Sequence, residues 1–331
     1  MQRPAARLVA QGARFRKINR LPPPGVAGYA RPMIALLRPL AFLFLLAAAA
    51  VAQAAPRCDL GTAGATQRVA IGDRSVLIHL PRGYDPARPA PLVMLLHGSG
   101  ASGAAMLADS GLARTADTHG FLVAAPDGGI VHERGFVWNI PGVPTVAGKI
   151  PGPDAPDDVA FLTTTIDRLA ARGCVDPARV YATGLSGGGR MTSWLGCVAA
   201  DRFAAIAPVV GLRAGNPLSA DPTRPDPASC RPARAMPVIA FAGDADRTNP
   251  IQGGGAPYWS YTMHAAEQRW AALNGCTAAP TTVWVAARVY EERYTGCRDG
   301  AEVAGRITVG GGHRWVVDND AMWAFLSRHR R

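Results

Sequence analysis

Short, almost continuously apolar runs alternate with longer amphipathic segments from about residue 67 onward. The runs at 91–97 and 121–125 lack polar alternation, as expected of strands covered on both faces of a parallel sheet. In 157–173, apolar residues instead recur at helical spacing, and the segment ends at Gly173. This alternation predicts the α/β class, with a mostly parallel central sheet and helices on both of its faces.

Turn-forming residues separate the predicted elements. We expect strands at 69–71, 76–80, 91–97, 121–125, 179–183, 203–210 and 238–242, β-rich stretches at 282–294 and 302–309, and helices at 103–119, 157–173, 187–200, 258–274 and 317–329. The first two strands should form a hairpin. Two long loops, 127–156 and 213–237, follow strand ends, where α/β sheets bind ligands. They are either pocket walls or surface insertions.

Composition and charge narrow the function classes. Of 331 residues, 48% are hydrophobic and 18% charged, which excludes a disordered protein. The net charge of +11 at first suggests a polyanionic partner. Residues 1–54, however, contain eight Lys and Arg and no Asp or Glu, so the rest of the chain carries only +3. A nucleic acid is therefore not an expected partner, and we expect a monomer.

The same basic segment has the features of a secretory signal. It contains the apolar run Leu40–Val51 and then Ala52-Gln53-Ala54, which predicts cleavage after Ala54. A stable membrane anchor is the alternative, but the run is shorter than the ~20 residues of a spanning helix. The long stretch before Met33 suggests that Met33 is the true start and 1–32 an extension. The predicted organisation is a signal segment (1–54) and one catalytic domain (55–331).

All six cysteines lie after this segment, and an even number in an exported chain indicates disulfides. Cys276 and Cys297 flank a strand-rich stretch and form the first pairing that we expect. Fifteen full pairings exist. The next choices are a Cys197–Cys230 bridge and a Cys58–Cys174 bridge. No C-x-x-C spacing is present, so the sequence predicts neither a zinc site nor any other metal or cofactor.

The strand at 179–183 leads into Gly184-Leu-Ser186-Gly-Gly188, a G-x-S-x-G motif in front of a helix. In such an elbow the serine takes a strained backbone conformation, and the glycines two residues away prevent a collision. We therefore predict that Ser186 is a nucleophile. A flexible glycine turn is the alternative.

A serine nucleophile needs a histidine base, which in α/β-hydrolases comes last in the chain. Only His264, His313 and His329 follow Ser186. His264 falls within a predicted helix and His329 in the basic tail, whereas His313 follows a strand. His313 is therefore the predicted base.

The acid of the triad should follow the strand at 238–242, where Asp244 and Asp246 compete. We choose Asp246 to orient His313, and expect Asp244 to cap the turn. The oxyanion should be bound by the backbone amides of Gly187 and Ser99. His97 is expected to order the Ser99 loop rather than to act as a base.

Aromatic residues near the predicted site are candidates for substrate binding. Trp138, Tyr258, Trp259 and Tyr261 could form a platform for a sugar or a ferulate ring, and Trp315 directly follows the His313 motif. Core packing is the commoner role of such residues. We take Trp138, Tyr258 and Trp315 as candidate substrate-binding residues.

Beyond these residues, the chain resembles a known family from about 67 to 329. The shared motifs are Leu96-His-Gly98, Pro126-Asp-Gly128, Val137-Trp-Asn139, Asp157–Phe161, Asp176–Ser186, Phe203–Pro208, Asn274-Gly-Cys276, Gly296-Cys297 and Gly310–Trp315. They are similar to those of the secreted polyhydroxybutyrate depolymerase and feruloyl esterase group of α/β-hydrolases.

The resemblance implies an α/β-hydrolase fold, an ester hydrolase with the triad Ser186, Asp246 and His313, and a Cys276–Cys297 bridge. The chain departs from the family pattern at Ser99, where a cysteine is frequent, at Gly187, and at Val316, which stands in place of a proline. These changes affect the pocket edge, so the reaction class is better defined than the substrate.

We therefore expect an exported serine carboxylesterase without a cofactor. Its substrates would be hydroxyalkanoate oligomers, or feruloyl or acetyl esters of plant polysaccharide. One alternative is a serine peptidase, which usually carries a propeller or cap domain for which this chain has no room. The other is a non-catalytic polymer-binding module, which would be expected to have a broken triad.

Overall fold

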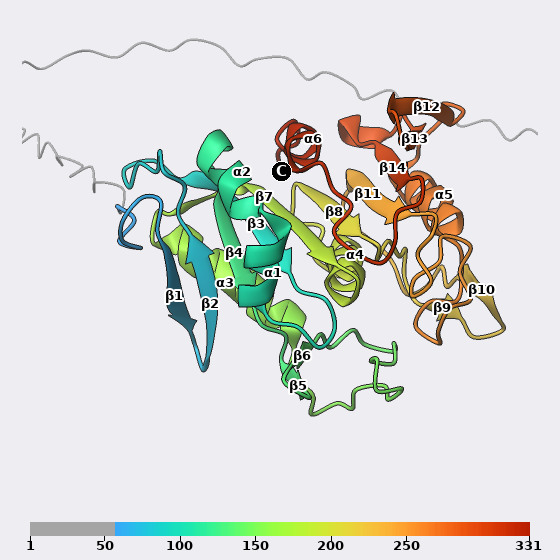
Figure 1. Ribbon diagram of the computed structural model, residues 1–331, viewed down its shortest axis with the longest axis horizontal. Coiled ribbons are helices and arrows are strands. Elements are labelled where there is room, and N and C mark those ends of the chain that lie inside the picture. Colours follow the sequence, from blue (N-terminus) through green and yellow to red (C-terminus); the bar gives the residue numbers. More distant parts are fainter. Residues whose placement is uncertain (1–56) are drawn as a thin grey trace, which may run out of the picture. The chain divides into compact units, whose positions relative to one another are not determined.

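The computed structural model describes residues 57–331, which contain a ten-stranded sheet with the order β1-β2-β4-β3-β7-β8-β11-β14-β13-β12 (Figure 1). Its strands are β1 (Thr66–Ile71), β2 (Arg74–His79), β3 (Ala90–Leu96), β4 (Leu122–Pro126), β7 (Val175–Leu185), β8 (Ala205–Val209), β11 (Val238–Gly243), β12 (Thr281–Ala286), β13 (Val289–Tyr294) and β14 (Val303–Thr308). The strands from β4 to β14 in this order pair in parallel. The two strands at each edge pair antiparallel. The predicted class and the predicted first hairpin are therefore confirmed.

Six α-helices cover the two faces of the sheet in the described residues. They are α1 (Gly103–Ser110), α2 (Leu112–His119), α3 (Asp158–Ala171), α4 (Gly187–Val198), α5 (Met263–Asn274) and α6 (Asn319–Leu326). Helices α1, α2 and α6 share one apolar cluster with Val93 and Leu95 of β3. Helices α3, α4 and α5 share the other with Leu92, Met94 and Leu96. The central strand β3 is thus buried on both sides, as its apolar sequence predicted.

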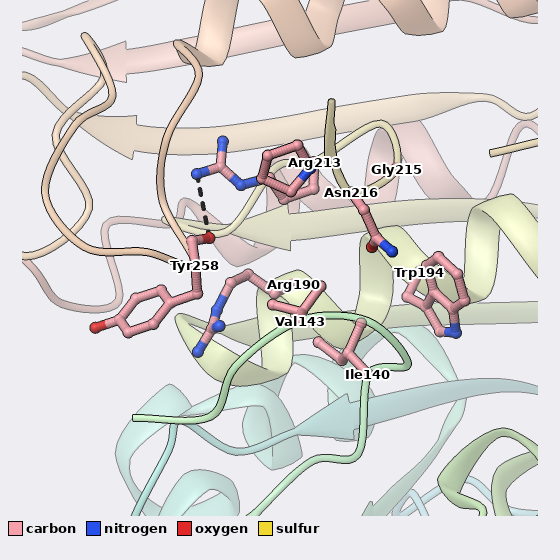
Figure 2. A pocket seen from close by; sticks show the side chains of 9 residues that line it. Ile140, Val143, Arg190, Trp194, Arg213, Gly215, Asn216 and Tyr258 are labelled. Carbon is pink, nitrogen blue, oxygen red and sulfur yellow. Dashed lines mark hydrogen bonds between the residues drawn. The ribbon is translucent and has the colours of Figure 1, made fainter. Parts of the chain in front are cut away.

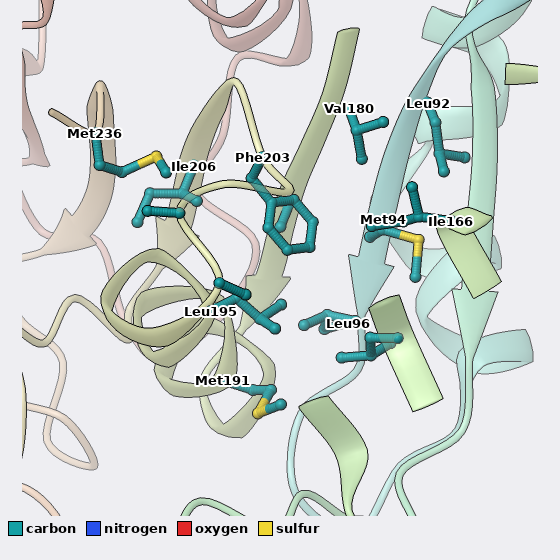
Figure 3. Close-up of a cluster of buried hydrophobic side chains, with 14 of the residues drawn as sticks. Leu92, Met94, Leu96, Ile166, Val180, Met191, Leu195, Phe203, Ile206 and Met236 are labelled. Atoms are coloured by element: carbon teal, nitrogen blue, oxygen red, sulfur yellow. The ribbon is translucent and has the colours of Figure 1, made fainter. Parts of the chain in front are cut away.

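The core under α4 fixes the position of the end of β7. Met191 and Leu195 of α4 point toward the sheet, and Phe203, Ile206 and Met236 lie close by (Figure 3). All five side chains are fully buried. Because α4 follows β7 directly, this packing holds the short connection between the two elements in one place.

Several element boundaries differ from the sequence prediction. The predicted helix 103–119 is broken at Gly111, whose φ of 67° no helix accommodates, so that α1 and α2 are separate. The helix expected at 258–274 begins only after Thr262, whose side chain accepts a hydrogen bond from Ala265 N. The two long loops contain short hairpins, β5 (Ile130–His132) with β6 (Gly135–Val137) and β9 (Pro217–Leu218) with β10 (Asp221–Pro225).

Three disulfides cross-link the described residues, and they confirm all three expected pairings. Cys58 joins Cys174 immediately before β7. Cys197 on α4 joins Cys230. Cys276 joins Cys297 beside the β12–β13 hairpin. Disulfides are typical of proteins that mature in an oxidising compartment.

No helix within residues 57–331 is both long enough and apolar enough to cross a membrane. The predicted signal segment, its cleavage site and the Met33 start lie outside the described residues.

Candidate active site

Ser186 occupies the turn between β7 and α4 in a strained backbone conformation. Its φ of 54° and ψ of −109° lie where non-glycine residues are rare. The amide of Ser186 donates a hydrogen bond to the carbonyl of Val209, at the end of the neighbouring strand β8. The strain is therefore held by the sheet itself, as in a nucleophile elbow.

The glycines around Ser186 are required by close backbone contacts. A Cβ on Gly184 would lie 2.6 Å from the carbonyl oxygen of Leu96, and one on Gly188 would lie 2.2 Å from it. Real side chains do not approach a backbone oxygen this closely. The motif predicted that side chains at these two positions would collide with their surroundings. The structure confirms this, because the backbone oxygen of Leu96 leaves no room for them.

The two predicted oxyanion donors lie against each other. A Cβ on Gly187 would lie 3.0 Å from the amide nitrogen of Ser99 and 2.3 Å from its hydroxyl oxygen. Both amides therefore belong to one small region at the N-terminus of α4, where the helix dipole favours negative charge.

His97 holds the Ser99 loop in place. Its ring is fully buried, Nε2 accepts a hydrogen bond from Gly128 N at 2.8 Å, and Nδ1 donates to Gly98 O at 2.7 Å. Burial lowers the pKa of His97, so its ring is neutral. This arrangement confirms the structural role predicted for His97.

His313 is hydrogen-bonded to Asp246, as the sequence predicted. The His313 Nδ1 to Asp246 Oδ2 distance is 2.8 Å, and the Asp246 side chain is fully buried. The other carboxylate oxygen of Asp246 accepts hydrogen bonds from the amides of Thr248 and Asn249 at 2.8 and 2.9 Å. Asp246 is thereby fixed from both sides and orients the imidazole.

The residues that competed with Asp246 and His313 for a place in the triad have other contacts. Asp244 accepts a hydrogen bond from Gly310 N at 2.6 Å, and so fastens the loop that carries His313. His264 contacts Glu292 at 3.2 Å, and His329 lies 3.6 Å from Glu302.

Ser186 and His313 line the same open cavity of about 480 Å³. Its walls are the Ser99 loop, α1 with Met106, and the His313 loop with Trp315. Within residues 57–331, the His313–Asp246 hydrogen bond is formed, but no hydrogen bond joins Ser186 to His313. Such contacts often tighten only when substrate binds.

The structure distributes the candidate aromatic residues unevenly. Trp315 lines the cavity, and Tyr258 is half-buried near it. Trp138 is buried, and its indole N–H donates to the carbonyl of His97, so it supports the Ser99 loop from below. Trp259 and Tyr261 are also buried, which agrees with core packing as their commoner role and leaves too few exposed rings for an aromatic platform.

Two arginines near this site were missed by the sequence interpretation. Arg190 and Arg213 are 5% and 6% exposed and line one small pocket with Tyr258 (Figure 2). Arg190 lies four residues after Ser186, one helical turn along α4. This spacing from Ser186 was the sequence feature that could have identified Arg190.

One group of donor atoms in the described residues has the spacing of a metal site. His264, Glu267 and Glu292 each offer an atom within 4.8 Å of the others. The group lies between α5 and β13, and none of its residues lines the cavity of Ser186.

The parallel sheet, the strained elbow and the order of Ser186, Asp246 and His313 together define the α/β-hydrolase fold. A family model described as "Prolyl oligopeptidase family" matches residues 113–214. The fold is shared with acetyl xylan esterase from Aspergillus awamori, with a TM-score of 0.56 at 16% identity, over 80% of this chain and 99% of that one.

Relatives in sequence agree with the resemblance described above. The chain is 31% identical over 261 residues to feruloyl esterase B of Piromyces equi, covering 77% of this chain and 45% of the relative. It is 35% identical over 142 residues to poly(3-hydroxyalkanoate) depolymerase C of Paucimonas lemoignei, covering 42% of this chain and 32% of the relative. The resemblance is confirmed, although the chain spans less than half the length of either relative.

Proposed function

We propose that this chain is a serine carboxylesterase. The observation that carries the proposal is the shared cavity of Ser186 and His313, with the strained elbow on one side and the buried Asp246 behind the imidazole. The names of both relatives, a feruloyl esterase and a polyhydroxyalkanoate depolymerase, support ester hydrolysis over other hydrolase reactions.

The reaction follows from the roles that this geometry permits. The hydroxyl of Ser186 attacks the ester carbonyl while His313 Nε2 takes its proton, and Asp246 stabilises the resulting imidazolium. The oxyanion accepts hydrogen bonds from the amides of Gly187 and Ser99. The alcohol then leaves with the proton of His313. Water, activated by His313, attacks the acyl-enzyme and releases the acid and the free serine.

We propose hydroxyalkanoate oligomers, or feruloyl or acetyl esters of plant polysaccharide, as substrates. The relatives' names and a cavity of about 480 Å³ that is open to solvent support these classes. Trp315 lines this cavity and is proposed to contact the substrate, together with Tyr258, which lines the small pocket of Arg190 and Arg213.

We also propose that residues 1–54 direct export and are removed, so that the mature protein acts outside the cytoplasm as a monomer. The three disulfides support an oxidising destination. N-terminal sequencing of the exported protein checks the cleavage after Ala54.

Replacing the nucleophile tests the proposed activity. We expect Ser186→Ala to lower hydrolysis of p-nitrophenyl butyrate by at least about a thousandfold, because no other hydroxyl can form the acyl-enzyme. Phenylmethylsulfonyl fluoride should sulfonylate Ser186 of the unaltered protein only, with loss of HF, and mass spectrometry detects the added phenylmethylsulfonyl group. Circular dichroism checks that the variant folds, and Ser75→Ala on β2 is the matched control.

A substrate panel separates this proposal from its alternatives. Methyl ferulate, acetylated xylan and 3-hydroxybutyrate oligomers are compared with an N-acyl peptide p-nitroanilide. Turnover of the anilide without turnover of any ester would indicate a peptidase. Near-normal activity of Ser186→Ala would exclude Ser186 as the nucleophile.

A further inference from the structure

Two buried guanidinium groups lie beside the candidate oxyanion site without a carboxylate partner. Arg190 and Arg213 are each about nine-tenths buried or more. A buried charge is costly unless it is paired or fully hydrogen-bonded. Within residues 57–331, neither group forms a salt bridge with a carboxylate: the Tyr258 ring lies beside Arg190, and Tyr261 and Trp259 lie beside Arg213. Burial lowers the pKa of both to about 10, so both remain cationic near neutral pH.

Arg213 is largely satisfied by the protein. It donates to the carbonyl of Tyr258 at 3.5 Å (Figure 2). It also donates to the carbonyl of Tyr261 at 2.9 Å and stacks over Trp259 at 3.4 Å. Its contacts fix the segment that carries Tyr258. Arg213 therefore has a structural role in shaping the pocket.

Arg190 is not satisfied in this way. It stacks over the Tyr258 ring at 4.1 Å, and its one hydrogen bond in the described residues is a long contact of 3.4 Å to the Ser99 hydroxyl. Its Nε is buried without any partner, as is that of Arg213, so the two residues differ in the contacts of their terminal nitrogens. The guanidinium thus retains donors for a group that the protein does not supply.

The small pockets around Arg190 lie next to the cavity of the nucleophile and share a lining residue, Ser99, with it. Arg190 lines two small neighbouring pockets of about 20 and about 10 Å³, which also share Ile140 and Val143. The smaller pocket reaches Ser99 and Gly187, and Ser99 in turn lines the large cavity that holds Ser186. Pockets of this size hold about one water each. A carboxylate, with two oxygen atoms, would replace about two such waters.

We propose that Arg190 binds a free carboxylate of the substrate, so that the enzyme prefers esters with an anionic group a few bonds from the scissile carbonyl. This inference rests on the proposed esterase function. Arg190 lies four residues after Ser186, about 6 Å further along the helix axis. A planar guanidinium matches a carboxylate with two parallel hydrogen bonds, and the small pockets favour a carboxylate over a bulkier phosphate.

A matched pair of substrates tests the inference. The linear dimer of 3-hydroxybutyrate is compared with the methyl ester of the same dimer, and cleavage of the bond between the two units is followed by chromatography. We expect kcat/KM of the wild-type protein to be at least about tenfold higher for the free acid. This measurement needs no variant, and equal values would overturn the proposal.

Substitutions at Arg190 and Arg314 then show which residue causes the preference for the free acid. Arg190→Met should lower the ratio of the two kcat/KM values at least about tenfold, whereas Arg314→Met should change it less than about threefold. Arg314 is the control because it is an exposed cation that lines the same large cavity. Equal changes in both variants would indicate general attraction of anions and would overturn the assignment to Arg190. Thermal unfolding checks that each variant folds.

Binding separates this inference from the esterase proposal. If the wild-type protein cleaves neither dimer, Ser186→Ala is titrated with both in a calorimeter. Tighter binding of the free acid than of the methyl ester would support the carboxylate site although the proposed function had failed. Equal binding, or no binding of either, would overturn it.

Discussion

The three residues of the candidate triad are held in place in three different ways. Ser186 is raised by a strained turn, and Asp246 is held by two backbone amides. His313 lies on a glycine-rich loop that is fastened by Asp244 at Gly310. The imidazole of His313 is oriented by its hydrogen bond to Asp246, so the position of the base depends on that bond.

That dependence gives a prediction for Asp246. We expect Asp246→Asn to lower kcat about 10²- to 10⁴-fold, because a neutral amide stabilises the imidazolium poorly and permits the wrong tautomer of His313. KM for p-nitrophenyl butyrate should change little, because Asp246 is buried behind the base. Steady-state kinetics at pH 7.5 provides the measurement.

Asp244→Asn is the control for this experiment, since the two residues are two positions apart on the same loop. It should lower kcat less than about tenfold, because an amide oxygen can still accept the hydrogen bond from Gly310. Equal losses in the two variants would show that the loop fold, and not the Asp246 charge, matters.

At the residue level, the order of strands and loops along the chain predicted more of the candidate site than the chemistry of single residues did. The contact between His313 and Asp246 followed from the order of strands and loops, because parallel strand ends meet at one edge of a sheet. Arg190 was not predicted, because an arginine is normally exposed and only the packing of Tyr258 and the 137–145 loop shows that it is buried. Trp138, chosen as a substrate-binding candidate, is buried, whereas the burial of Trp259 agrees with the core packing that was considered the commoner role.

At the level of elements, the connection after β3 is stabilised by a neutral buried histidine. The His97 ring joins the β3 end to the start of the 127–156 loop through Gly128, and its carbonyl accepts the indole N–H of Trp138. Protonation would convert Nε2 from an acceptor into a donor facing Gly128 N. The Ser99 amide depends on this connection for its position.

The lowered pKa of His97 predicts how stability depends on pH. Below about pH 6.5 the unfolded chain protonates this histidine while the folded protein does not, so the unfolded state binds more protons. The free energy of unfolding should therefore fall as the pH decreases from 6.5 toward 5, by at most about 1.4 kcal/mol per pH unit for one proton. Urea unfolding at several pH values measures this slope. In His97→Gln the slope should be smaller, and an unchanged slope would contradict the prediction.

Elements with strong apolar patterns were predicted correctly, and those that depend on backbone detail were not. The buried strands β3, β4 and β11 were evident because few loop segments are so apolar. The break between α1 and α2 depends on the left-handed conformation of Gly111, and a single glycine inside a helical pattern does not reveal its φ. The short hairpins in the long loops have no apolar alternation to indicate them.

At the level of the whole molecule, the candidate triad follows the ends of β7, β11 and β14, which lie inside the sheet and not at its outer edges. The outer strands are stabilised by other contacts. The β12–β13 hairpin forms one outer edge, and all six residues of β12 are exposed. The Cys276–Cys297 bridge lies at the base of this hairpin. The order of strands in the sheet could not be predicted from local patterns, because it is set by contacts distant in the chain.

The three disulfides should contribute unequally to stability. The Cys58–Cys174 bridge closes a loop with a sequence separation of 116 residues, and the Cys276–Cys297 bridge one of 21. In the chain-entropy model these correspond to about 5 and about 3 kcal/mol. Urea unfolding of the two double Cys→Ser variants should therefore show the larger loss for the 58/174 pair. The reverse order would contradict this account.

The pattern of these bridges also bears on how the protein is made. Each disulfide joins cysteines that are neighbours in the sequence of six: the first with the second, the third with the fourth, and the fifth with the sixth. A chain that crosses a membrane from its N-terminus exposes its thiols in this order. An oxidase that joins each newly exposed thiol to the preceding unpaired thiol produces the three native disulfides and no others. If the chain is exported as proposed above, an oxidant at the exit site is therefore sufficient to form its disulfides, without an enzyme that reshuffles wrong pairs.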